Sequence, residues 1–135
     1  ASDVYKRQEI ESIGDSCYNL ARTINHKYRG NEDFTEKQYS HIHQMFQLTD
    51  DALNQMVSLV EDEGHQVDVN KSFNLENEIN NYRSQLKNQN VLDVNNKEYD
   101  YQMGVHYMDL IGECEKLGDY IVNVVEARTD MKEKK

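Results

Sequence analysis

Hydrophobic residues along this chain recur every three or four positions, the spacing that places side chains on one face of an α-helix. Four segments show this spacing, and each predicts an amphipathic helix: about residues 3–28, 34–61, 70–88 and 97–128. Polar and apolar residues never alternate for long enough to predict a strand. The connections are short, so neighbouring helices are expected to be antiparallel. We therefore predict an all-α fold, an up-down bundle of about four long helices.

Each predicted helix has one apolar stripe that we expect to be buried. In chain order the stripes are Ile10, Ile13, Cys17, Leu20, Ala21 and Ile24; Ile42, Met45, Phe46, Leu53, Met56, Val57 and Val60; Phe73, Leu75, Ile79, Tyr82 and Leu86; and Tyr107, Leu110, Ile111, Cys114, Leu117, Ile121 and Val125. Both cysteines lie in these stripes, and we expect them to be small core side chains rather than a disulfide.

Local signals predict where the helices begin and end. The stretch Thr-Glu-Lys-Gln at residues 35–38 matches a capping box and predicts the start of the second helix. Gly30 and Gly64 are expected to end the first and second helices. The polar, asparagine-rich segment 89–96 predicts a loop or a weak helical joint. The charged tail, residues 130–135, is expected to be frayed.

The bulk composition narrows the class of protein. A length of 135 residues suits one domain, and the absence of proline favours long helices. The formal net charge of −10 opposes binding to nucleic acid or anionic lipid, so no nucleic-acid partner is expected. No apolar run approaches the roughly 18–20 residues that span a bilayer, and no signal peptide is visible.

One pattern occurs twice in the chain. Residues 9–19 and 113–123 share the frame Glu-x-Glu-x-aliphatic-Gly-Asp-x-x-x-Asn, with a constant offset of 104 positions. Such a repeat predicts two copies of one supersecondary unit. The second copy follows a full unit of chain, whereas the first follows only eight residues. We therefore expect the chain to begin inside the first unit, as a piece of something larger.

The repeated polar residues form two helical rows beside the apolar stripes. Residues four apart share a helix face, which gives the rows Glu11, Asp15 and Asn19, and Glu115, Asp119 and Asn123. Like charges at this spacing cost about 0.2–0.5 kcal/mol per pair, and a glycine inside a helix costs about 1 kcal/mol. The repeated cost suggests close helix approach at the glycines and a cation at the acids. The alternative is an ordinary solvated helix face.

These two stretches resemble the PhoU family. PhoU-like proteins have two three-helix repeats, and the third helix of each carries a motif close to Glu-Arg-Ile-Gly-Asp-x-x-x-Asn-Ile. The matching residues here are 11–20 and 115–124. Both copies keep the Glu, Gly, Asp and Asn of the motif, and both replace its arginine, with Ser12 and Lys116.

Two further stretches, residues 75–86 and 107–111, resemble one branch of the family. That branch is the cytoplasmic C-terminal domain of bacterial sodium-dependent phosphate cotransporters. The resemblance implies a single PhoU-like domain truncated at its N-terminus. Residues 1–30 would be the last helix of a truncated first repeat, residues 31–129 the second three-helix repeat, and residues 130–135 the tail.

The resemblance also implies a metal site. Family members can bind multinuclear metal clusters on the bundle surface, through the Glu and Asp of the motif and acids on the preceding helix. Carried over by position, Glu11, Asp15, Glu115 and Asp119 are the candidate ligands for divalent or iron-type ions. The chain departs from the pattern at residues 73–74, where Phe73 and Asn74 stand in place of an acid.

The expected function is non-enzymatic: a cytoplasmic regulatory domain that modulates phosphate uptake by a sodium-dependent cotransporter. Its expected partners are the transmembrane part of the transporter or another regulatory protein, and a second copy of the chain in a homodimer. Two alternatives remain open, a free-standing PhoU-like regulator of phosphate signalling and a metal-dependent enzyme on a helical bundle. The chain lacks the paired Glu-x-x-His motifs of di-iron bundles, which counts against the enzyme.

Overall fold

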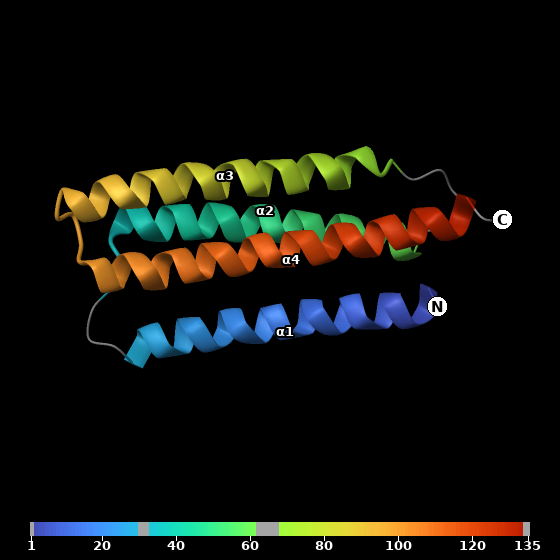
Figure 1. Ribbon diagram of the computed structural model, residues 1–135, viewed down its shortest axis with the longest axis horizontal. Helices are drawn as coiled ribbons and strands as arrows, with labels where there is room; N and C mark the ends of the chain where they lie inside the picture. The colour runs from blue at the N-terminus through green and yellow to red at the C-terminus, as the bar shows by residue number, and fades with distance from the viewer. Residues whose placement is uncertain (1, 30–32, 62–67, 134–135) are drawn as a thin grey trace.

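Four long α-helices make up the computed structural model of the chain (Figure 1). They are α1 (Ser2–Arg29), α2 (Glu36–Glu61), α3 (Asn70–Asn95) and α4 (Tyr101–Glu133). The structure describes residues 2–29, 33–61 and 68–133, and no strand occurs in these ranges. None of the described helices is long and apolar enough to cross a membrane. The predicted all-α bundle of four long helices is confirmed.

The helix α4 occupies the centre of the bundle (Figure 1). It contacts α1, α2 and α3, and α2 also contacts α3. Among the described helices, α1 contacts α4 alone. Successive helices run in opposite directions along the bundle axis, and α1 is also antiparallel to α4. The fold is thus a three-helix core of α2, α3 and α4, with α1 laid against the outside of α4.

The central position of α4 explains why its predicted core is confirmed in full. All seven predicted residues are at most 2% exposed: Tyr107, Leu110, Ile111, Cys114, Leu117, Ile121 and Val125. Helices on three sides also bury Met103, Val122, Val124 and Ala127, which the predicted stripe omits. Burial of this kind supplies most of the stability of an amphipathic helix.

The predicted stripe of α1 is wrong at several positions. Ile10 is 57% exposed, and Cys17 and Ala21 are exposed as well. Ile13 and Leu20 do pack against the core, while the buried residue between them is Ser16. The side chain of Ile24 lies outside the described residues. The reason is that α1 rests on a single helix, which covers only a narrow face.

The second helix starts as predicted but presents a different face near its end. Thr35 and Gln38 form the capping box: the Thr35 N–H donates to Gln38 Oε1 (3.0 Å), and the Gln38 N–H donates to Thr35 Oγ1 (3.1 Å). Val57 and Val60, predicted to be buried, are each 44% exposed, and Leu59 is buried instead. The buried face includes Thr49 and Ala52. Because one of these side chains is polar and the other is small, the apolar pattern did not predict their burial.

The third helix is longer than predicted. It continues to Asn95, so residues 89–95 are helical, and of the two alternatives predicted for this segment the loop is wrong. The buried Asp93 accepts a hydrogen bond from Gln89 Nε2 (2.9 Å) and pairs with Lys37 of α2 (3.6 Å), which ties this polar segment to the bundle. The chain then turns at Lys97, which has a φ of 61°.

The boundaries of α4 also differ from expectation. The helix starts at Tyr101 instead of residue 97, and it continues to Glu133, into the tail predicted to be frayed. Gly30 and Gly64, the predicted stops of the first two helices, lie outside the described residues.

Candidate functional site at the motif copies

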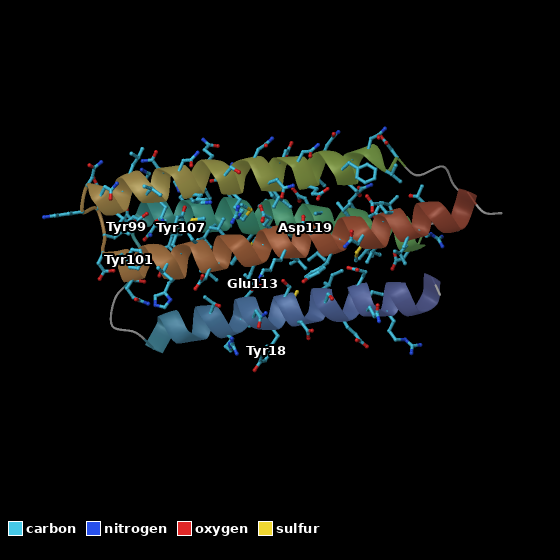
Figure 2. The ribbon with its side chains drawn as sticks, viewed as in Figure 1. Tyr18, Tyr99, Tyr101, Tyr107, Glu113 and Asp119 are labelled. Carbon is cyan, nitrogen blue, oxygen red and sulfur yellow. The ribbon has the colours of Figure 1, made fainter. Side chains whose placement is uncertain are left out.

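The second motif copy lies on α4 and faces α3. Gly118 is buried, and a Cβ built on it would lie 3.4 Å from Ile79 Cδ1 of α3, an ordinary van der Waals contact. The two acids of the copy, Glu115 and Asp119, flank this contact along the seam between α3 and α4 (Figure 2 labels Asp119). The motif therefore marks where α4 packs on α3.

The protein itself supplies a cation for Glu115. Arg83 Nε of α3 lies 3.4 Å from Glu115 Oε2, and both side chains are about one-quarter to one-third exposed, 32% and 26% respectively. An ion pair this accessible to water contributes at most about 1 kcal/mol. Its main consequence is that one of the four candidate metal ligands already has a positively charged neighbour.

The other acid of this copy meets a carboxyl group that sequence reasoning missed. Glu76 of α3 hydrogen-bonds to Asp119, and its pKa is raised by partial burial first, and then by the hydrogen bond and charge of Asp119 and by the charge of Glu126. A hydrogen bond from Asn80 opposes the rise. The resemblance to PhoU proteins implies an acid at residues 73–74, but position 76 lies one turn before Ile79, on the side of α3 that faces Gly118.

The raised pKa of Glu76 gives a pH-dependent prediction. A carboxyl group with a raised folded-state pKa stabilises the fold below its unfolded pKa, and the contribution is lost as the pH rises through the folded value. Glu76→Gln removes the charge that is unfavourable at neutral pH. We expect a gain in unfolding free energy of no more than about 0.5 kcal/mol at pH 7, which shrinks as the pH falls through the raised pKa of Glu76 to the ordinary value of 4.5. Urea unfolding at several pH values measures it, and a gain that grows on acidification would contradict it.

The first motif copy has no such neighbours in the described part of the chain. Glu11 and Asp15 are exposed on α1, and a Cβ on Gly14 would meet nothing within 4 Å. The expected close helix approach is therefore absent at Gly14. Residues of α1 and α4 that are equivalent in sequence thus have different surroundings, because α4 is covered by α2 and α3 whereas α1 is not.

The carboxylate oxygens of the four candidate ligands suit hard cations. However, too few of them lie together to hold a metal cluster. Among the side chains that the structure describes, those of residues 7–23, 33–61 and 68–129, no three His, Cys, Asp or Glu residues gather where they could hold a metal ion. The structure brings Glu115 and Asp119 to one seam and leaves Glu11 and Asp15 on another surface. Metal binding by the four residues stays a prediction.

The first glutamate of each repeat lies at the seam between α1 and α4. Ser16 Oγ donates to Glu113 Oε2 (3.0 Å), and Lys116 Nζ lies 3.4 Å from Glu113 Oε1. About two helical turns away along the same seam, Asn123 Nδ2 donates to Glu9 Oε2 (3.3 Å). Figure 2 labels Glu113 between the two helices. The ends of the two motif copies thus meet across antiparallel helices, an arrangement that their repetition in sequence did not reveal.

Cys114 and His41 are held by the packing of the bundle. Burial raises the pKa of the Cys114 thiol to about 12, so this thiol stays protonated at neutral pH. Cys17 is free and exposed. His41 Nδ1 and the buried Tyr107 hydroxyl share a hydrogen bond of 3.0 Å, and burial followed by the charge of Lys37 lowers the His41 pKa.

Comparison with known families decides the class of protein. The sequence model of the PhoU domain matches residues 42–127, more than half of the chain. The chain belongs to the PhoU domain family. The matched part runs from α2 to the second motif copy in α4. PhoU domains are non-enzymatic regulators of phosphate signalling and transport, so the alternative of a metal-dependent enzyme is not supported. Comparisons with curated proteins and with solved structures return no match.

Proposed function

We propose that this PhoU domain is the regulatory domain of a sodium-dependent phosphate cotransporter. It would act on the cytoplasmic side, modulating phosphate uptake through contacts with the transmembrane part of the transporter. One observation carries the proposal. The α3 stretch that resembles the cotransporter branch contains Ile79 and Arg83, and these residues contact Gly118 and Glu115 of the family motif. The branch-like residues and the motif therefore meet along the α3–α4 seam, where Arg83 and Glu115 are partly exposed.

The test is sodium-driven uptake of radiolabelled phosphate by cells that carry the full-length protein. We expect Glu115→Ala combined with Asp119→Ala to change the initial uptake rate by about fivefold, a typical coupling between a regulatory surface and a second site. Both side chains lie off the buried core of α4, so the melting temperature should change little. Asp50→Ala combined with Asp51→Ala removes two exposed acids from α2 and serves as the matched control. Equal effects from the two pairs, or no effect from either, would contradict the proposal.

A free-standing PhoU-like regulator of phosphate signalling is equally compatible with the family match. The gene sequence upstream of the codon for Ala1 separates the two functions. Segments encoding membrane-spanning helices would support the cotransporter, and a gene that encodes only PhoU repeats would support the regulator.

The homodimer proposal is supported by the exposed side of α1. Ile10 is 57% exposed and Tyr18 is 67% exposed, and Figure 2 shows Tyr18 on the side of α1 away from α4. Where such side chains gather into one patch, the patch is typical of an interaction surface. Light scattering that shows only monomers at high concentration would count against the dimer.

A further inference from the structure

A groove runs along α3 and α4 near the turn that joins them, at the end of the bundle where Figure 2 labels Tyr101. Its volume is about 510 Å³. Aliphatic side chains form much of the lining: Val91 and Val94 from α3, and Val105 and Met108 from α4. Neither the family match nor the proposed function assigns a role to this groove.

Close packing of the two helices shapes the groove. Gly104 of α4 lies against α3, and a Cβ there would stand 2.9 Å from Val94 Cγ2 and 3.1 Å from Asn90 Oδ1. The Tyr99 hydroxyl also donates to Asn90 Oδ1 (2.5 Å), which fixes the connecting segment. The groove is therefore a preformed feature of two packed helices.

Exposed apolar side chains border the groove. Val91 is 54% exposed and Tyr101 is 73% exposed. Leu92, beside Val91 on α3, is 53% exposed. Apolar side chains that gather at a groove mark a place where another molecule docks.

The two rims carry opposite charges. On the α3 side, Arg83 is paired with Glu115, and Lys87 is exposed. On the α4 side, Asp109 is exposed. The complementary molecule therefore has an apolar ridge, an acidic group facing α3 and a basic group facing α4.

We propose that this groove receives one amphipathic helix of a partner protein, with an acidic flank against Lys87 and a basic flank against Asp109. The lining spans residues 83–95 of α3, which is about 18 Å at 1.5 Å per residue. A helix of about three turns matches that length and presents aliphatic residues at the spacing that grooves of this kind accept. The proposal goes beyond the transporter function and stands whether or not this PhoU domain belongs to a cotransporter.

Designed peptides test the proposal. Three fluorescent helical peptides share one leucine ridge and differ in the charges on either side of it. The mixed peptide has one acidic flank and one basic flank. The two uniform peptides have either two acidic flanks or two basic flanks. A mixed peptide satisfies both rims in one of its two chain directions. We expect the full chain to bind the mixed peptide more tightly than either uniform peptide, by about two- to fivefold for each mismatched rim charge at physiological salt.

Two matched variants make the outcome decisive. Lys87→Glu makes both rims acidic, so its preferred peptide should become the one with two basic flanks. Lys71→Glu changes the net charge equally from an exposed α3 position outside the groove, and it should keep the wild-type preference. Circular dichroism confirms that both variants are folded.

Three results would overturn the proposal. The first is the absence of measurable binding of the mixed peptide to the wild type. The second is an unchanged preference in Lys87→Glu. The third is self-association of the wild type that Lys87→Glu abolishes and Lys71→Glu does not, which would assign the groove to a second copy of the chain.

Discussion

Ile121→Ala lowers the free energy of unfolding by about 2–5 kcal/mol, the usual cost of truncating a fully buried isoleucine. The side chain is 1% exposed at the centre of the bundle, where α4 is enclosed by the other helices. Its removal leaves a cavity that packed neighbours fill only in part. Urea unfolding followed by circular dichroism measures the loss.

Ile10→Ala is the matched control, because it makes the same chemical change on the exposed side of α1. Ile10 is 57% exposed, so we expect a change within about 0.5 kcal/mol. A loss as large as that of Ile121→Ala would show that another surface covers Ile10. The burial of Ile10 that the sequence pattern predicts for α1 would then be correct.

Glu113→Ala is expected to loosen α1 without unfolding the three-helix core. Ser16 is 2% exposed and donates to the Glu113 carboxylate, and the remaining acceptor in reach is the Glu113 carbonyl oxygen at 3.4 Å. Weakening this buried hydrogen bond costs about 1–2 kcal/mol, which corresponds to roughly 5- to 30-fold faster opening of α1. Amide hydrogen exchange should therefore accelerate in α1 and stay nearly unchanged in α3.

Two variants separate the hydrogen bond from the charge. Glu113→Gln keeps a side-chain oxygen that can accept from Ser16, so exchange in α1 should stay close to that of the wild type. Lys116→Ala removes the exposed partner of Glu113 and should have little effect, because such ion pairs contribute at most about 1 kcal/mol. Uniform acceleration across all four helices in Glu113→Ala would contradict a separately held α1.

The accuracy of sequence reasoning varied with the surroundings of each helix. In α4 every predicted core residue is buried, since helices on three sides make a wide apolar face necessary. In α1 the same reasoning gave the wrong face at Ile10 and Cys17, because one neighbouring helix covers a narrow strip centred on Ser16. Periodicity identifies a helix, but it does not show how many neighbours the helix has.

Polar contacts explain two further differences between prediction and structure, the helical segment after residue 88 and the role of Glu76. The asparagine-rich segment after residue 88 has little apolar periodicity, yet Asp93 joins it to Lys37 and Gln89 and keeps it helical. Glu76 was missed for a similar reason, since its importance depends on Asp119 from a helix more than forty residues away in sequence. Pairings between distant polar side chains leave no local signal in the sequence.

The sequence by itself determined the four helices, the capping box at Thr35, the repeated motif on two of the helices and the resemblance to PhoU domains, because each depends on residues close together in the chain. Only the tertiary structure decided that Glu115 pairs with Arg83, that Asp119 meets Glu76, and that Glu113 and Glu9 each accept a hydrogen bond from the opposite motif copy. These contacts depend on how each helix is rotated about its axis. That rotation is set by the total burial and pairing of all the helices together, and no single segment contains it.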